Sequence, residues 1–422
     1  CRTVSYIQRN GKIPFLIFTK GKQMKKSIIN SIFLCAAFAS LVGFSSCHDD
    51  IYGAINNEIK LNSSGLQGDI HSIVHYKNYI LTCNGEIFYK TNKPSSETGL
   101  HNRQWNSTTS PTSEKGDNGI PATTYFLATD SEYLYALTYI WVENDDGENE
   151  PKTATIYATN SEDPAKGLVW TKVANISGGN YSFENAKVIF DNKYFSVAED
   201  NSVSIANREA YARIRASSQD TYKLYKLNGS NAPAEVSNPT FIGESDATNA
   251  ISACYFNNST YFSKYYGMSS NANCLYYTKT YTRSNNVSTN SSLYYITASD
   301  ATEQSVDLDA GGLLSIAAAK DYILLGTSSG LSRVKINETT GIPDGDTSNM
   351  RRNGNSVISE YVFMVFVLNP NKCEGSNDTT LGTDEYAAST IYGSIRSSSD
   401  SWDDAGLYAW YPANDEWNRD GD

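Results

Sequence analysis

The chain has 422 residues, of which 40% are hydrophobic and 12% aromatic, and its formal net charge at pH 7 is −12. This acidic balance argues against a nucleic-acid partner, because affinity for a phosphate backbone depends on Lys and Arg side chains that displace counterions. The length allows one large all-β domain or two or three smaller ones, and 30 Tyr with many Ser, Thr, Asn and Gly favour strands and turns.

The N-terminal part is typical of a segment that is removed. Residues 1–23 begin without Met and show no fold-like pattern, so we interpret them as an over-extended gene start. Two lysines directly follow Met24, and an apolar run over 28–44 and small residues then lead to Cys47, which is the layout of a secretory signal. The run is shorter than the roughly 20 residues of a transmembrane helix, which is the alternative. We therefore expect a signal peptide over 24–46.

The stretch FSSC, which ends at Cys47, resembles the lipobox of bacterial lipoproteins, in which the chain is cleaved before a cysteine whose sulfur receives a lipid. Phe44 departs from the usual Leu at the first lipobox position. Asp49 and Asp50 resemble the surface-export signal of lipoproteins from the Bacteroidetes phylum. The resemblance implies a lipid on Cys47, a short tether over 47–65, and an outer-membrane location exposed at the cell surface.

One pattern recurs over residues 66–422: an apolar strand, a short polar turn, and then a Tyr that opens the next strand. The marker residues are Tyr79, Tyr133, Tyr194, Tyr261, Tyr322 and Tyr386. They are spaced by 54 to 67 residues, and each is followed by a further apolar or aromatic strand that ends in a turn-former. A fixed-order repeat indicates one supersecondary unit that is used many times.

The first two units match in more detail. The segments YKTNKPSSETGL from Tyr89 and YATNSEDPAKGL from Tyr157 share Tyr, Thr-Asn and Gly-Leu at the same offsets, and they lead to Trp105 and Trp170. The second of these motifs, around Gly167, also loosely resembles the Asp-box turn of sialidase-type propellers.

Four antiparallel strands repeated about six times specify a β-propeller, in which radial arrangement leaves no long open sheet edge. The sequence therefore predicts an all-β chain whose residues 66–422 form one propeller of six four-stranded blades. One alternative is a seventh blade within 199–221 or 340–358. The other is a row of β-sandwich domains, whose ~100-residue length does not match the observed spacing.

Successive connections in an antiparallel blade alternate between its two ends. The connections predicted at one end are uniformly short, whereas several of those predicted at the other end are long, namely 141–152, 199–221 and 396–405. Long loops on a rigid scaffold often bind ligands. The candidate ligand-binding residues on this face are Tyr139, Trp141, Asp145, Asp146, Trp402, Asp403 and Asp404.

Aromatic planes beside carboxylates suit sugar rings, whose apolar faces stack and whose hydroxyls donate hydrogen bonds. The sequence thus predicts recognition of a glycan or protein ligand. Two alternatives stay open: a glycoside hydrolase or lyase that uses paired carboxylates, and a structural subunit of an envelope complex. No catalytic residue can be nominated.

No metal or cofactor is predicted. The acidic run 144–150 lacks the ligand spacing of an EF-hand, and no phosphate-binding glycine motif occurs. His71 and His75 share one predicted strand face without an evident third ligand, so we interpret them as structural.

Four cysteines follow Cys47, and disulfides among them stay open. These are Cys83, Cys254, Cys274 and Cys373. The predicted strands place Cys254 and Cys274 two strand spacings apart, about 9 to 10 Å, beyond the ~7 Å limit for a disulfide. Buried free thiols are the favoured interpretation.

Overall fold

The structure is a computed structural model, and the chain divides into two compact units, Cys1–Ser63 and Ser64–Asp422. The described residues all belong to the second unit. They are 66, 68–91, 105–116, 119–130, 132–176, 188–191, 196–197, 203–204, 208–215, 220–242, 250–279, 292–319, 321–350, 358, 360–367, 391–396, 406–411 and 416–419.

Strands make up nearly all the regular structure of these residues. Sheet 1 contains β1 (Ile73–Tyr76), β2 (Tyr79–Asn84), β3 (Glu86–Thr91) and β4 (Asn106–Ser107). Sheet 2 contains β5 (Thr123–Thr129), β6 (Leu134–Glu143), β7 (Asn149–Thr159) and β8 (Thr171–Ile176). Sheet 3 contains β9 (Val188–Asp191), β12 (Glu209–Ile214), β13 (Lys223–Asn228) and β14 (Asn231–Glu235). Sheet 4 contains β15 (Thr240–Phe241), β16 (Ser252–Phe256) and β17 (Ser259–Ser263).

The remaining strands follow in the same manner. Sheet 5 contains β18 (Met268–Ser270), β19 (Cys274–Tyr277), β20 (Ser292–Thr297) and β21 (Gln304–Asp307). Sheet 6 contains β22 (Leu313–Ala318), β23 (Tyr322–Thr327), β24 (Gly330–Ile336) and β25 (Pro343–Asn349). Sheet 7 contains β26 (Tyr361–Val367), β27 (Ile391–Arg396), β28 (Gly406–Tyr411) and β29 (Glu416–Arg419). A separate ribbon pairs β10 (Ser196–Val197) with β11 (Val203–Ser204), and η2 (Pro164–Lys166) is a short 3₁₀ turn.

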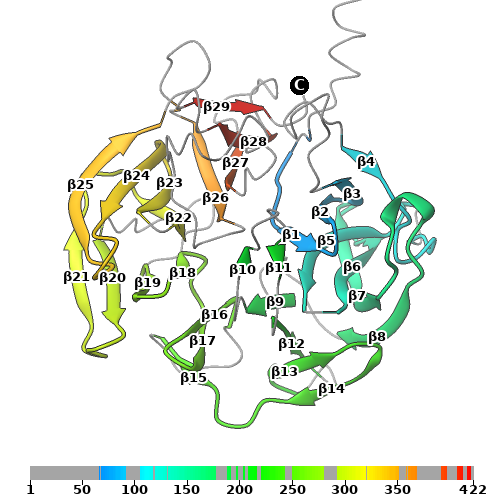
Figure 1. Cartoon of the computed structure of the whole chain (residues 1–422). Helices are drawn as coiled ribbons and strands as arrows, with labels where there is room; N and C mark the ends of the chain where they lie inside the picture. The colour runs from blue at the N-terminus through cyan, green and yellow to red at the C-terminus, as the bar shows by residue number, and fades with distance from the viewer. Residues whose placement is uncertain are drawn as a thin grey trace, which may run out of the picture. The chain divides into compact units, whose positions relative to one another are not determined.

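Within this unit the sheets lie side by side around a common centre, each with one strand innermost (Figure 1). The innermost strands contact one another in the order β1, β5, β9, β16, β18, β22 and β26. All the pairings are antiparallel except β15 with β17. This arrangement is a β-propeller, as the repeat predicts. The described residues contain no α-helix, and none of their helical segments is long and apolar enough to cross a membrane.

The core lies between neighbouring sheets. Strands β1 and β22 are buried at every residue, because each is enclosed by other sheets on both faces. This explains why the sequence reads as a continuous apolar run at LLSIAA (313–318) rather than as an alternation.

Serine side chains connect the innermost strands. The Ser72 hydroxyl accepts a hydrogen bond from the backbone N–H of Leu127 in β5 at 2.8 Å, and the Ser269 hydroxyl accepts one from Ala318 in β22 at 2.9 Å. A backbone N–H on an inner strand edge would otherwise be buried without a partner. We call these contacts the serine bridges, and each joins one sheet to the next.

A third serine bridge joins sheet 7 to sheet 1, where the Ser394 hydroxyl accepts from the Ile70 N–H at 3.0 Å. Leu407 also donates its N–H to the carbonyl of Leu66 at 3.0 Å. Beside these bonds the buried ammonium of Lys90 lies 4.7 Å from the centre of the Trp105 ring and 5.3 Å from that of Tyr392. The first and last sheets are thus joined by hydrogen bonds and side-chain packing. The described strands of each sheet come from one stretch of chain.

The described residues form six sheets of four strands, one sheet of three strands and the separate ribbon, and the number of blades in the whole chain stays a prediction. Within the described residues, the strands that the two alternative segments contribute belong to sheets 3 and 6 and to the separate ribbon. The repeat counted at Tyr261 is divided between two sheets, since β16 and β17 belong to sheet 4 while the later strands form sheet 5. The segments 209–214 and 343–349 are themselves strands, β12 and β25, rather than loops.

Two further expectations are wrong in detail. Strand β9 pairs with β12 and not with the strand after Tyr194, so residues 192–208 connect the first two strands of sheet 3. The connection between β26 and β27 spans 368–390, which includes Tyr386 outside the described residues. We expected only short turns between the first two strands of each blade. In sheets 3 and 7 these two strands are joined by long connections.

Cysteine placement agrees in part with the prediction. Cys83, Cys254 and Cys274 are free thiols, and the first and third are buried whereas Cys254 is half-buried. Cys254 and Cys274 lie in different sheets, on β16 and β19, and not on alternate strands of one sheet. Cys373 is outside the described residues.

Candidate functional site

The two ends of the sheets can be distinguished by their turns. Strand β1 ends at a tight turn over 77–78, and β5 ends at the turn before Tyr133. The turn at Gly85 lies at the opposite end, where Gly85 and Thr124 exchange backbone hydrogen bonds of 3.1 and 2.7 Å. We call the end at which β1, β5 and β26 begin the Trp141 face, and the other end the Tyr76 face.

Strand β6 carries a row of side chains from the core to the Trp141 face. Tyr135, Leu137 and Tyr139 point to the same side and are at most 1% exposed, whereas Trp141 is half-buried. They pack with Ala212 and its neighbours in β12, and we call this group the β6 cluster. The burial gradient shows that the long β6–β7 hairpin lifts Trp141 out of the core.

Half-buried rings continue this row across three sheets. Phe363 of β26 lies 5.1 Å from His71, and His71 lies 6.4 Å from Tyr125 of β5, as measured between ring centres. Tyr125 lies 5.8 Å from Trp141. We call Phe363, His71, Tyr125 and Trp141 the aromatic row. All four are half-buried, and they come from the beginning of β26, the segment before β1, the beginning of β5 and the end of β6.

Hydrogen bonds and packing hold the Trp141 end of the row. The Trp141 Nε1–H donates to Thr123 Oγ1 at 2.5 Å, and buried Tyr139 lies 5.2 Å from Tyr125 and 6.1 Å from Trp141 between ring centres. Because Thr123 pairs with Tyr139 in the β5–β6 ladder, the indole is fixed by two strands of one sheet. A ligand would therefore find this ring already oriented.

The acidic residues of the hairpin lie beyond Trp141. Residues 144–148 form its turn, in which the Asn144 side chain accepts from the N–H groups of Asp146 and Glu148 at 3.1 and 2.8 Å. Asp145 and Asp146 are exposed. Most of 141–152 is strand rather than loop, since β6 continues to Glu143 and β7 begins at Asn149.

The predicted ligand-binding residues thus have different positions. Trp141 is half-buried on a strand, and Asp145 and Asp146 are exposed at a turn. Tyr139 is 1% exposed, so in the described structure it packs beneath the row instead of facing a ligand. Trp402, Asp403 and Asp404 lie outside the described residues. Ligand binding by these residues stays a prediction.

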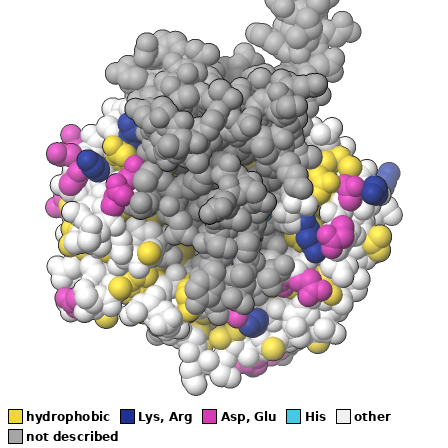
Figure 2. Space-filling model, viewed as in Figure 1, with side chains coloured by type: hydrophobic (Ala, Val, Ile, Leu, Met, Phe, Trp, Pro, Cys, Tyr) yellow, Lys and Arg dark blue, Asp and Glu magenta, His cyan; other side chains and the backbone are white. Residues whose placement is uncertain are grey.

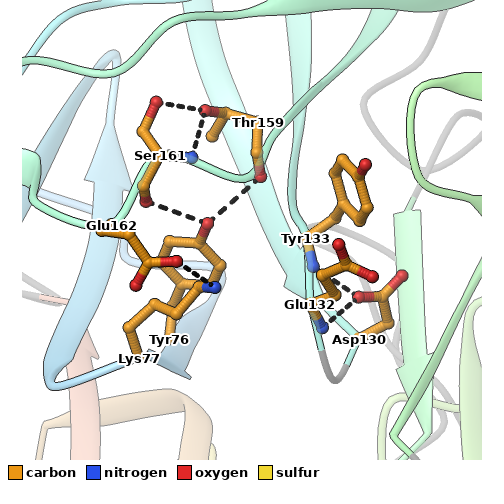
Figure 3. A network of polar contacts seen from close by, with 8 residues as sticks. All are labelled: Tyr76, Lys77, Asp130, Glu132, Tyr133, Thr159, Ser161 and Glu162. Atoms are coloured by element: carbon orange, nitrogen blue, oxygen red, sulfur yellow. Dashed lines mark hydrogen bonds and ion pairs between the residues drawn. The ribbon is translucent and has the colours of Figure 1, made fainter.

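The Tyr76 face carries a network of structural polar contacts, part of which Figure 3 shows. The Tyr76 hydroxyl donates to the carbonyls of Thr159 and Ser161 at 3.3 and 3.0 Å, and Lys77 pairs with Glu162 at 2.9 Å (Figure 3). Burial raises the pKa of Tyr76, so its hydroxyl stays protonated and able to donate. These contacts tie sheet 1 to the loop that follows β7.

Buried charge on the same face also has a structural partner. Arg208 donates a hydrogen bond to the carbonyl of His75 at 2.9 Å. Burial lowers the pKa of Arg208 to about 9, although the negative charge of Asp130 acts to raise this pKa. Asp130 in turn accepts from the Tyr135 hydroxyl at 2.5 Å and from two backbone N–H groups of its turn. The polar groups of this face are therefore used in joining sheets 1, 2 and 3.

Charged side chains are scattered over the described part of the face that Figure 2 shows. Figure 2 shows acidic side chains at several separate places, with basic side chains near some of them. In the same part of the chain, no group of three or more His, Cys, Asp or Glu is placed to hold a metal ion.

No family model matches the chain, and no curated protein matches it.

Solved structures with a similar fold include the PQQ-bound aldose sugar dehydrogenase of Streptomyces coelicolor, at 9% identity and a TM-score of 0.38, covering 81% of this chain and 94% of that one. A protein described as a glucose dehydrogenase from Thermus thermophilus has 9% identity and a TM-score of 0.39, with 82% and 97% covered. A prolyl endopeptidase has 9% identity and a TM-score of 0.38, and the chain covers 50% of it. The likeness to these proteins concerns the fold alone.

The aromatic row offers apolar ring faces with polar groups beside them, which is the composition of many small-molecule and sugar sites. The sequence identifies Trp141 through its place in an aromatic, acid-rich hairpin. It does not identify Phe363 or Tyr125, and it suggests only a structural role for His71. These residues are far apart in the chain and become neighbours only when sheet 7 meets sheet 1.

Proposed function

We propose that this chain recognises a glycan through the aromatic row on the Trp141 face. The observation that carries the proposal is the continuity of Phe363, His71, Tyr125 and Trp141, four half-buried rings in successive contact. Rings that served only the core would be buried like Tyr139, whereas rings that stack on sugars must keep part of their surface open.

The strands and contacts that hold the aromatic row in place favour recognition by a preformed surface. All four rings lie on strands or directly beside them, and Trp141 is held by Thr123. Binding to side chains that are already ordered costs little conformational entropy. Asp145 and Asp146, exposed at the hairpin turn, supply carboxylate oxygens that accept hydrogen bonds from sugar hydroxyls.

The proposal includes the cellular location of the protein. The signal over 24–46 and the FSSC stretch support a lipoprotein that is anchored in the outer membrane through Cys47 and exposed at the surface. Cys47 lies outside the described residues. Incorporation of labelled palmitate into the wild-type chain, and its loss in Cys47→Ser, would test the anchor separately from binding.

The proposed function is tested by titrating the full chain against an array of neutral and acidic glycans. Trp141→Ala should weaken binding by about tenfold or more, as for a central aromatic contact. Trp170→Ala is the matched control, because Trp170 is also half-buried and its Nε1–H donates to the Thr109 carbonyl at 2.9 Å, but it lies outside the aromatic row. Thermal melting of both variants would show that each one folds.

Three outcomes decide between the candidate functions. Binding that is lost in Trp141→Ala and kept in Trp170→Ala supports the proposal. New, smaller products detected by mass spectrometry in the same wells would replace it with a carbohydrate-active enzyme. Wild-type protein that binds no glycan on the array would contradict the proposal and favour a protein partner in the envelope.

A further inference from the structure

The ring planes of the aromatic row turn from each ring to the next. The angle between planes is 60° for Phe363 and His71, 45° for His71 and Tyr125, and 52° for Tyr125 and Trp141. No two successive rings are therefore parallel. The rings come from sheets 7, 1 and 2, whose innermost strands β26, β1 and β5 follow one another around the centre (Figure 1). The row thus extends across three sheets while its planes turn.

The spacing of the rings suits a chain of sugars. Successive ring centres are 5.1, 6.4 and 5.8 Å apart, which is close to the length of one pyranose unit in a glycan chain. A single sugar placed on one ring would leave the others without a contact. A chain of three or more units reaches rings of all three sheets, and each added contact strengthens binding.

The tilt between the rings selects among chain shapes. The apolar face of a sugar stacks parallel to the plane of an aromatic ring. Sugars that stack on successive rings of the row must therefore be tilted by 45 to 60° to each other. Successive sugar planes are nearly parallel in a flat ribbon such as a β-1,4-linked glucan, so only one unit at a time can stack. In a helically wound chain, such as an α-1,4- or β-1,3-linked glucan, each unit is rotated against the last and several can stack.

The charge beside the row disfavours acidic sugars. The tip of the β6–β7 hairpin, 143–150, has no Lys or Arg and carries exposed carboxylates at Glu143, Asp145, Asp146, Glu148 and Glu150. Glu143 follows Trp141 by two residues, so at ~3.4 Å per residue the tip begins within about 10 Å of the row. Charges still interact over this distance at moderate salt. Carboxylates repel uronate and sulfate groups, whereas they accept hydrogen bonds from neutral hydroxyls.

We propose that the ligand of the Trp141 face is a neutral, helically wound glycan chain of at least three sugar units. This inference rests on the proposed function and adds the class of glycan. Successive units of the chain stack on successive rings of the aromatic row, and hydroxyls at one end of the chain donate to the carboxylates of the hairpin. A flat ribbon or a single terminal sugar would stack on only one ring at a time.

The first test uses three glucose hexasaccharides that differ only in linkage. The α-1,4-, β-1,3- and β-1,4-linked isomers are titrated into the full-length wild-type protein by calorimetry. At least one of the two wound isomers should bind about tenfold or more tighter than the β-1,4-linked ribbon.

The outcomes of this titration separate the inference from the proposed function. An equal or higher affinity for the ribbon would overturn the inference and leave the proposed function standing. Binding of none of the three isomers, by a protein that binds another glycan on the array, would do the same. A protein that binds neither these isomers nor any glycan on the array would contradict the proposed function itself.

The length of the bound chain is tested with Phe363→Ala, at one end of the row. The wild type should bind the preferred hexasaccharide about tenfold tighter than the disaccharide of the same linkage. Because the substitution shortens the row, the ratio of these two affinities should fall by about threefold or more. Phe363→Leu keeps apolar volume without the flat ring face, so it should give the same result. An unchanged ratio in both variants would overturn the inference.

Phe366→Ala is the matched control. Phe366 is a half-buried phenylalanine of the same strand, β26, but it packs against the core between sheets 7 and 1 and does not belong to the row. This variant should keep the wild-type ratio of affinities. Thermal melting of all three variants shows that each one folds.

A sulfated form of the preferred hexasaccharide tests the charge. At low salt it should bind the wild type several-fold more weakly than the neutral form, and added salt should narrow the difference. An equal or higher affinity for the sulfated form at low salt would overturn the neutral class of ligand.

Discussion

The hydroxyl of Tyr79 donates a hydrogen bond to Asp163 Oδ1 at 2.8 Å, and this contact joins β2 of sheet 1 to the turn η2 of sheet 2. Burial and the hydrogen bond raise the pKa of Tyr79 to about 12, while the same bond is the main cause that lowers the pKa of Asp163. The contact between sheets 1 and 2 should therefore weaken both at alkaline pH, where Tyr79 loses its proton, and at acidic pH, where Asp163 gains one.

Alkaline pH should weaken this contact. The Tyr79 pKa is about 12 in the folded chain and its ordinary value is 10.0, so its contribution to stability is complete below pH 10 and is lost as the pH rises toward 12. Tyr79→Phe should be less stable than wild type at pH 8, and the difference should shrink by about pH 11. Urea unfolding followed by fluorescence at both pH values measures this. A gap that widens with pH would contradict the assignment.

Asp163→Asn tests the acidic side of the same pair. The lowered pKa of Asp163 means that its contribution is complete above its ordinary value and is lost as the pH falls through the depressed value. We expect the variant to be less stable than wild type at pH 7 and the two to converge below about pH 4, near the ordinary carboxyl pKa. Acid unfolding curves that stay parallel down to about pH 2 would disprove the coupling.

Ser394→Ala should loosen the junction between sheets 7 and 1. The substitution leaves the Ile70 N–H buried without the oxygen that accepts it at 3.0 Å, which costs about 1–3 kcal/mol of unfolding free energy. Ser292→Ala is the control, since the Ser292 hydroxyl bonds Asp307 at an exposed position, and a change below ~0.5 kcal/mol is expected. Urea unfolding compares the two, and equal losses would refute a special role for the serine bridge.

Gly326 allows two strands to approach closely. A Cβ at this position would lie 2.7 Å from the backbone oxygen of Val362 in β26 and 2.5 Å from Ser315 Oγ. The serine can rotate but the backbone oxygen cannot move without β26, so Gly326→Ala should cost about 1–3 kcal/mol. In Gly393→Ala the nearest atom is at 3.4 Å, and no loss is expected. Thermal or urea unfolding tests the pair, and a harmless Gly326→Ala would show that the two strands can separate.

The three described thiols should differ in reactivity. Burial raises the pKa of Cys83 to about 12 and that of Cys274 to about 11, whereas Cys254 is half-buried. Because the thiolate is the reactive form, a short alkylation at about pH 8 should label Cys254 first. Peptide mass spectrometry before and after denaturation measures this. Labelling of Cys83 in the folded protein would indicate that sheet 1 opens.

The sequence predicts the units around Tyr79, Tyr133 and Tyr322 well because their first two strands are joined by tight turns and carry strong apolar patterns. It misses sheet 5 because β18 and β19 have only three and four residues, too short to show a period. It misses the pairing of β9 with β12 because local patterns favour the next strand in the chain, whereas sheet 3 uses a later one.

The candidate site is predictable only in part for a related reason. Trp141 and its hairpin are local in sequence, so pattern and composition identify them. Contacts such as that of His71 with Phe363 join residues that are distant in the chain, and they depend on how the last sheet meets the first. Burial is equally non-local. Tyr139 and Trp141 lie on the same side of one strand, yet Tyr139 is buried within the cluster that includes β12, whereas Trp141 is only partly buried against it.

The serine bridges also bear on how the protein opens. The described strands of each sheet come from one stretch of chain, and neighbouring sheets are joined by packed side chains and a few hydrogen bonds, such as those of the three bridges, and not by a continuous ladder. Such an assembly resembles a row of repeats with nearest-neighbour coupling more than one indivisible ladder. Slow amide exchange should therefore vary from sheet to sheet, and each sheet should lose its protection as a block.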